Sequence, residues 1–234
     1  MKNIFVRPAS TQIKPEGSAS AALIAGLSLI VMALAAMFAF GFIHTQLVMP
    51  EDAAATAVNI ATQPNLFQVE ISLWIVIAIA DIIVSLTLWL YFAGVNRRLS
   101  MITGLVRLVY TVSLILGIFN LLKASGSPDA LRWIESFENI WSIGLIIFGL
   151  HLILLAWLTF MSGFVPAIWS WLLLIAGPSY MIINIPSNPG SVFNRIVVVL
   201  EMILVVPMTI AELGFAIWLI VRAVKTIKAA TSSP

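Results

Sequence analysis

Four ionisable side chains stand inside long apolar stretches of the sequence: Asp81, Arg107, His151 and Glu212. A charged group at the centre of a bilayer costs about 3 kcal/mol on insertion scales, so such residues need partners or a purpose. With a helical rise of about 1.5 Å per residue, all four lie between about 9 and 20 Å from the same side of the membrane. The sequence therefore predicts one buried polar cluster, which could relay protons or bind a ligand.

The charges of this predicted cluster do not balance by themselves. Arg107 stays charged and can compensate one carboxylate, so the second must be protonated, pair with a protonated His151, or meet a ligand cation. A proton shared among Asp81, Glu212 and His151 is the functional hypothesis. The alternative is structural, because buried polar groups can hold helices together at about 0.6 kcal/mol for an average contact. The sequence leaves both alternatives open.

Two further acids repeat one spacing along the chain. Glu70 precedes Asp81 by eleven residues, and Glu201 precedes Glu212 by eleven. Eleven residues make almost three helical turns, so each pair lies on one face of its helix. We expect Glu70 and Glu201 to be secondary acids nearer the outer surface. We also expect the two faces to form a polar seam between the second and sixth membrane spans.

The composition of the chain, with few charged and many apolar residues, indicates its class. Of 234 residues, 61% are hydrophobic and 9% are charged, and the mean hydropathy is +1.08. Soluble domains average about 45–50% apolar and about 25% charged residues, and disorder needs low hydrophobicity with a high net charge. The chain is therefore predicted to be a membrane protein. Its net charge of +2 is too small to indicate a nucleic-acid partner.

Six segments are long and apolar enough to cross about 30 Å of hydrocarbon as helices. They cover residues 19–43, 69–94, 101–122, 139–162, 165–185 and 195–221. We predict an all-α fold, a polytopic membrane helical bundle with a single six-helix transmembrane domain over residues 19–222. A cytoplasmic N-terminal segment (1–18) precedes this domain, and a cytoplasmic C-terminal tail (223–234) follows it.

Lysine and arginine set the predicted orientation, because they accumulate in cytoplasmic loops. If both termini are cytoplasmic, three basic residues lie outside (Lys123, Arg132 and Arg195) and eight lie inside (Lys2, Arg7, Lys14, Arg97, Arg98, Arg222, Lys225 and Lys228). We therefore predict a multi-pass protein of the inner (plasma) membrane with its N-terminus and C-terminus in the cytoplasm.

The loop between the first two spans, residues 45–68, contains signals of local structure. A short surface helix is predicted there, with Pro50 at its first position and the acids Glu51 and Asp52 in its first turn. Asn65 is the predicted N-cap of the second span.

Small residues and prolines predict how the helices pack and bend. Ser18, Ala22 and Gly26 recur every four positions and predict a close approach of the first span to a neighbour. Pro178 and Pro207 lie inside the fifth and sixth spans and predict bends there.

Catalytic and metal chemistry find little support in the sequence. The chain has no cysteine, and His44 and His151 are too few for a three-histidine zinc centre. His44 is interpreted as a solvated interface residue. Ser179 is predicted to lie towards the opposite side from His151, so a serine-protease pair is not indicated. No catalytic, metal or cofactor-binding residue is assigned, and an acid–base pair of carboxylates is the remaining enzyme option.

Several motifs resemble one bacterial family. They are residues 50–60 (PEDAAATAVNI), 95–100 (VNRRLS) with 107–109 (RLV), 148–152 (FGLHL), and 207–219. The chain resembles, over about residues 20–223, the family catalogued as domain of unknown function 4386, which contains small multi-span integral membrane proteins. The resemblance implies the topology and a shared polar set at Asp81, Asn96, Arg97, Arg107, Gly149, His151, Pro207 and Glu212. It implies no reaction.

Three classes of function follow from these observations. The first is binding or transport of a small molecule or a proton through the buried polar cluster. The alternative is a non-catalytic accessory or regulatory membrane component whose buried polar residues are structural. An intramembrane enzyme is the third. The predicted surroundings are the lipid bilayer, with no nucleic acid, and a protein partner or a second copy of the chain is compatible with each class.

Overall fold

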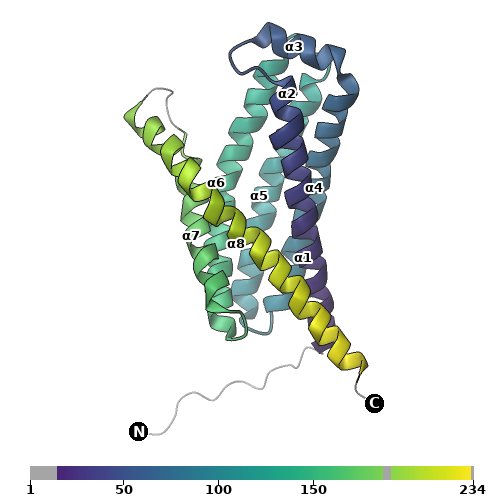
Figure 1. Cartoon of the computed structure of the whole chain (residues 1–234), viewed down its shortest axis with the longest axis vertical. Coiled ribbons are helices and arrows are strands. Elements are labelled where there is room, and N and C mark those ends of the chain that lie inside the picture. The colour runs from purple at the N-terminus through teal and green to yellow at the C-terminus, as the bar shows by residue number, and fades with distance from the viewer. Residues whose placement is uncertain (1–14, 187–190, 233–234) are drawn as a thin grey trace.

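The computed structural model describes residues 15–186 and 191–232, and this part of the chain forms helices joined by short loops, with no strand (Figure 1). The predicted all-α fold is therefore confirmed. The elements are α1 (Pro15–Phe38), the π-helical turn η1 (Ala39–His44), α2 (Thr45–Leu47), α3 (Ala53–Thr62), α4 (Pro64–Phe92), α5 (Arg97–Ala124), α6 (Ala130–Ser162), α7 (Ala167–Ile183) and α8 (Val192–Thr231). Most of the predicted N-terminal segment, residues 1–14, lies outside the described residues.

Five helices are long and apolar enough to cross a membrane. They are Ser18–Leu47, Pro64–Phe92, Arg97–Ala124, Ala130–Ser162 and Val192–Thr231. The predicted fifth span is also an apolar helix, α7, but its 17 residues make it shorter than the others. Its length is about 25 Å. The count of six spans and the side on which each terminus lies therefore stay predictions.

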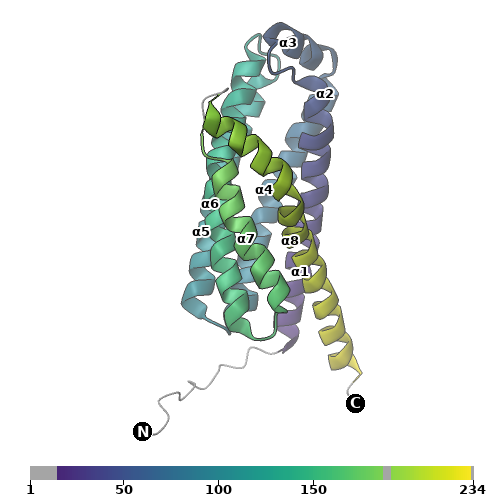
Figure 2. The ribbon, with the colours of Figure 1, turned by 60° about the vertical axis from the view of Figure 1, so that its left-hand side comes forward.

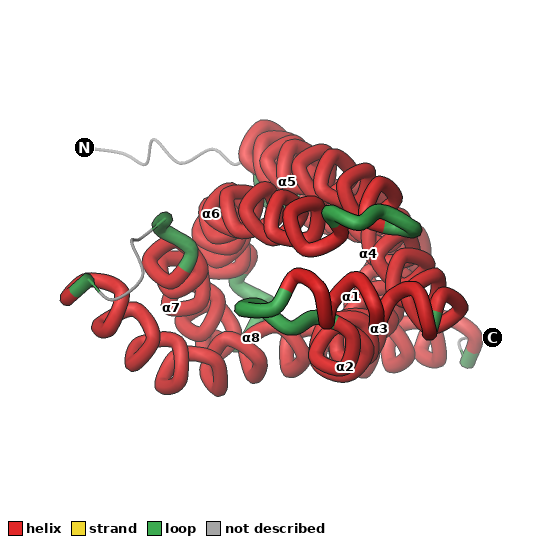
Figure 3. Tube along the Cα trace, turned by 90° about the horizontal axis from the view of Figure 1, so that it is seen from above, coloured by secondary structure: helices red, strands yellow, loops and turns green. Residues whose placement is uncertain are grey.

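The six long helices form a closed ring. Each of them contacts the next along the chain from α4 through α5, α6 and α7 to α8, and α1 closes the ring by packing against both α8 and α4. Figure 3 shows this arrangement from above, and Figure 1 shows α2 and α3 covering one end, which we call the α3 end. The polar seam predicted between the second and sixth spans is wrong, because α1 lies between α4 and α8 in the order of the ring.

The contact of α1 with α8 depends on small residues. A Cβ atom added to Gly26 would lie 2.8 Å from the carbonyl oxygen of Ala216, which is too close for any side chain. Ala22 is buried as well, so the predicted close approach of the first span to a neighbour is confirmed at Gly26. On the other side of the ring, α6 and α7 touch through Gly149 and Gly177, and a Cβ at Gly149 would lie 2.5 Å from the Gly177 carbonyl oxygen.

The observed starts of α3 and α4 correct two of the local predictions. The short helix α3 begins at Ala53 with Asp52 as its N-cap, whose carboxylate accepts a hydrogen bond from the Ala55 N–H at 2.8 Å. Pro50 lies before this helix rather than at its first position. Asn65 is not an N-cap, because α4 begins at Pro64, whose missing N–H suits a first helical position.

The two interior prolines do not interrupt their helices. Pro178 lies inside α7 and Pro207 inside α8. Figure 2 shows α8 bending along its length. A proline inside a helix is a common cause of such a bend, since it removes one backbone hydrogen bond.

Candidate functional site

Three of the four predicted polar residues form one buried triad. Arg107 on α5 donates to Asp81 Oδ1 on α4 from Nη2 at 2.6 Å and from Nε at 2.8 Å. The Arg107 Nη1 group lies 3.2 Å from His151 Nε2 on α6, and His151 Nδ1 lies 2.9 Å from the Thr103 carbonyl oxygen. These partners fit one neutral tautomer, in which Nδ1 donates to the carbonyl and Nε2 accepts from the guanidinium. The triad therefore joins three neighbouring helices.

The triad is shut off from the space inside the ring. Asp81, Arg107 and His151 are at most 1% exposed. The Arg107 guanidinium lies over the Phe148 ring at 5.2 Å, and its Nη2 is 3.8 Å from the Met32 sulfur. Phe148 and Met32 line the central cavity, whereas no member of the triad does. Charge, hydrogen bonds and aromatic contact thus satisfy the guanidinium almost completely inside the protein.

Glu212 is separate from the triad. Its Oε1 accepts a hydrogen bond of 2.5 Å from the Tyr180 hydroxyl of α7. Among the described residues, no hydrogen bond or ion pair joins Glu212 to any member of the triad. The predicted cluster of four is therefore a group of three and a carboxylate with one neutral partner.

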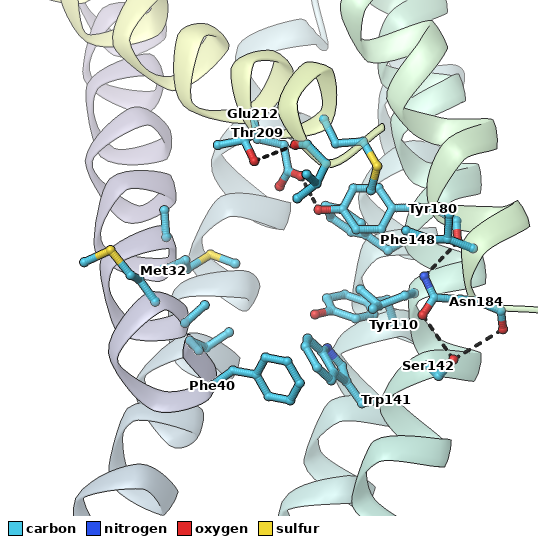
Figure 4. A pocket seen from close by; sticks show the side chains of 18 of the residues that line it. Met32, Phe40, Tyr110, Trp141, Ser142, Phe148, Tyr180, Asn184, Thr209 and Glu212 are labelled. Carbon is cyan, nitrogen blue, oxygen red and sulfur yellow. Dashed lines mark hydrogen bonds between the residues drawn. The ribbon is translucent and has the colours of Figure 1, made fainter. Parts of the chain in front are cut away.

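Glu212 faces a cavity of about 760 Å³ inside the ring. Ligand pockets in proteins usually measure roughly 300 to 1,000 Å³. Its lining includes six aromatic residues: Phe40, Trp74, Tyr110, Trp141, Phe148 and Tyr180. Figure 4 shows Met32 and Phe40 on one side of the cavity, facing Tyr110 and Trp141 on the other.

The polar lining of the cavity carries one sign of charge. Three carboxylates, Glu138, Glu201 and Glu212, line it, and no lysine, arginine or histidine is among its described lining residues. The expectation that Glu201 and Glu212 share a helix face is confirmed, since both reach this cavity. Asn184 completes one wall by accepting from the Ser142 hydroxyl at 3.1 Å.

A second polar cluster, at the α3 end, was not predicted. His44 Nδ1 lies 2.8 Å from Glu70 Oε1, and His44 Nε2 lies 2.9 Å from Glu138 Oε1. The interpretation of His44 as a solvated residue is wrong, because only 6% of it is exposed. We call these three residues the outer cluster. Among the described residues, no group of three or more His, Asp or Glu side chains is arranged to hold a metal ion.

The π-helical turn explains why the sequence did not reveal this cluster. The first span was expected to end at residue 43 as a regular helix, but η1 carries the chain through His44 in a wider turn. Such turns change which face a side chain occupies, and they are frequent at functional sites. Glu70 was predicted as an acid on the face of Asp81, and both are fully buried. A histidine within one turn of a predicted span end, with an acid at the start of the next span, was the available signal.

Comparisons with known proteins give a family and an uncharacterised relative. The family described as domain of unknown function (DUF4386) matches residues 24–223. An uncharacterized protein of Archaeoglobus fulgidus is 28% identical over 149 residues, which cover 64% of this chain and 80% of that protein. No solved structure matches the chain.

Proposed function

The chain belongs to this family of unknown function, and because its description names no activity, we propose from the geometry that the protein binds a small ligand in its central cavity. One observation carries the proposal. Glu212, whose one hydrogen-bond partner among the described residues is the Tyr180 hydroxyl, faces an aromatic cavity whose described lining has three carboxylates and no basic side chain. Few polar groups converging in a largely apolar cavity are typical of ligand sites.

The triad has a structural role in this proposal. Arg107 binds both Asp81 and His151, His151 also binds the Thr103 carbonyl, and none of the three lines the cavity. They hold together α4, α5 and α6, which form one wall of the cavity. Glu212 is the group that we assign to ligand contact.

Filling the cavity tests this proposal. Ala33 lines the cavity, and its neighbour Leu34 is 51% exposed and does not line it. The wild type in nanodiscs is screened by thermal unfolding against small lipophilic compounds that differ in charge. We expect some of these compounds to raise the unfolding temperature, because a ligand stabilises the state that it binds. Ala33→Phe should abolish the shift, and Leu34→Phe should keep it. Equal shifts in both variants would show that the compounds bind elsewhere.

The placement of the protein in the membrane is part of the proposal. The bias of basic residues supports six crossing helices in an inner membrane, with both termini in the cytoplasm. Since the chain has no cysteine, single cysteines report their side without background. Ser125→Cys, at the exposed end of α5, should react with an impermeant maleimide in intact cells, and Ser232→Cys should react only after permeabilisation. The reverse pattern would invert the topology.

The same cavity supports a second candidate, which is proton passage. Glu138 of the outer cluster and Glu212 both line it, so water in the cavity would lie between two proton-binding groups. Proton flux into liposomes under an imposed pH gradient tests this candidate. Glu212→Gln should reduce the flux at least about tenfold, which corresponds to about 1.4 kcal/mol of barrier. A wild-type protein without flux under several gradients would exclude it.

A further inference from the structure

The cavity is elongated along the ring. Its lining runs on α1 and η1 from Leu29 to Phe40 and on α8 from Glu201 to Leu213. These stretches correspond to about 16 and 18 Å of helix. A slender molecule fits such a space better than a round one of equal volume.

One side of the cavity opens between α1 and α8. These two helices cross where Gly26 meets Ala216 and Ile220, so the crossing lies beyond the Leu29 end of the cavity. Figure 1 shows α8 crossing the bundle obliquely, with its first turns beside α7 and away from α1. Past the crossing, therefore, the last residues of α1, with η1, are separated from the first half of α8.

The exposure of the lining residues marks the same opening. Met37 is 56% exposed and Val205 is 49% exposed, and they come from α1 and α8. Trp74 and Tyr110, on the far wall, are at most 5% exposed. Because both edges of the opening belong to helices apolar enough to cross a membrane, the opening faces the hydrocarbon rather than water.

The chemistry of the lining selects the charge of the occupant. Among the described residues, the hydrogen-bond partner of the Glu212 carboxylate is a neutral phenol, so a cation placed beside the carboxylate would gain an ion pair in a poorly solvated space. Tyr180 and Tyr110 offer aromatic faces nearby, and aromatic faces attract cations. An anion would meet three carboxylates instead. The indole N–H of Trp74 has no hydrogen-bond partner among the described residues and can serve a polar atom of a ligand.

We propose that the ligand is a lipophilic cation, an amine or quaternary ammonium with a slender apolar chain, which enters from the bilayer between α1 and α8 and pairs with Glu212. This inference rests on the proposed function and adds the class of ligand and its route. The apolar length of the cavity holds the chain, and the carboxylate compensates the charge. The outer cluster does not compete for the cation, because His44 already binds Glu138.

Two probes that differ only in head group test the charge preference. The protein is placed in phosphatidylcholine nanodiscs with a terminally brominated dodecyl chain carrying either trimethylammonium or sulfate, at equal mole fraction in the lipid. Bromine quenches tryptophan on contact, and Trp74 and Trp141 line the cavity. We expect the quenching by the ammonium probe to saturate. Quenching by the sulfate probe should only rise in proportion to its mole fraction, because that probe reaches only tryptophans that face lipid.

Variants assign the saturable quenching to its residues. Glu212→Gln should raise the half-saturating mole fraction at least about tenfold, and Glu51→Gln, on the exposed loop before α3, should not change it. Ala33→Phe should remove the saturable component, and Leu34→Phe should retain it.

The route has its own measurement. A bulky maleimide on Val205→Cys should slow the onset of quenching severalfold, whereas the same label on Ile217→Cys, which is exposed but does not line the cavity, should not. An unchanged onset in the labelled Val205→Cys protein would overturn access from the bilayer.

The failures of the two proposals can be told apart. Saturable quenching of equal strength by both probes, removed by Ala33→Phe, would overturn the preference for a cation and leave ligand binding in the cavity intact. The ammonium probe could also give no saturable quenching while neutral compounds stabilise the wild type and not Ala33→Phe. That result would likewise overturn the preference for a cation and leave ligand binding in the cavity intact. If Ala33→Phe changes the response to no compound, both proposals fall.

Discussion

The triad and the cavity wall each hold a charged side chain in the interior of the bundle, but the two side chains differ in how many partners surround them. Arg107 has Asp81, His151, the Phe148 ring and the Met32 sulfur around it, and it does not line the cavity. Glu212 has the Tyr180 hydroxyl and an open cavity. A charge whose partners are all supplied by the fold is a structural element. A charge with one neutral partner and free space beside it is available for chemistry.

Removing the guanidinium should produce the largest effect on stability. Arg107→Met would leave the Asp81 carboxylate buried without its cation, and such a loss costs about 3–5 kcal/mol. The denaturant midpoint in detergent micelles measures this change. The double variant Asp81→Asn with Arg107→Met should recover part of the loss, because no uncompensated charge remains. A single variant as stable as the wild type would contradict the structural role of the triad.

The outer cluster should respond more weakly. His44→Phe removes the partner of the fully buried Glu70 carboxylate, and a hydrogen bond to a charged group contributes about 2 kcal/mol. The same unfolding measurement applies. Glu138→Gln is the matched control, since the Glu138 side chain is 40% exposed, and its effect should be smaller. A larger loss for Glu138→Gln than for His44→Phe would contradict a stabilising role of this cluster through His44.

The third member of the triad should contribute less than the guanidinium. His151→Leu leaves the Asp81–Arg107 ion pair in place and removes the hydrogen bonds to Arg107 and to the Thr103 carbonyl, at about 1–2 kcal/mol. His151→Gln keeps a donor and an acceptor and should restore part of that stability. Equal losses for both substitutions would show that ring packing, rather than hydrogen bonding, is the contribution of His151.

Glu212→Gln should change stability least, by less than about 1 kcal/mol, because the Tyr180 hydroxyl can donate to the amide oxygen. Ligand binding should nonetheless weaken strongly in this variant. Unfolding curves of Glu212→Gln and Arg107→Met, recorded side by side, measure the contrast directly. Similar losses in the two variants would remove the distinction between the triad and the cavity wall.

The features that the sequence predicted correctly depend on apolar length and on the residue count along a helix. Apolar length predicted the helices well: residues 69–94 and 165–185 were expected, and Pro64–Phe92 and Ala167–Ile183 are observed. Depth along a helix axis follows from residue count alone, so Asp81, Arg107 and His151 were correctly expected to lie near one another.

Other features depend on relations that residue counts do not contain. The order of helices around the ring places α1 between α4 and α8, and for that reason the predicted seam does not form. The same order separates Glu212 from the triad. The wider turn at η1 brings His44 inward, and nothing in its local residue types distinguishes that turn from an ordinary helix.

The contact between α1 and α8 also has a consequence for biosynthesis. A chain is made from its N-terminus, so α1 leaves the ribosome long before α8. Until α8 arrives, Gly26 lacks its neighbours Ala216 and Ile220, and the wall that carries Glu201 and Glu212 does not exist. The cavity is therefore completed only after α8 has packed, and a nascent chain that has delivered only α1 to α7 lacks this wall.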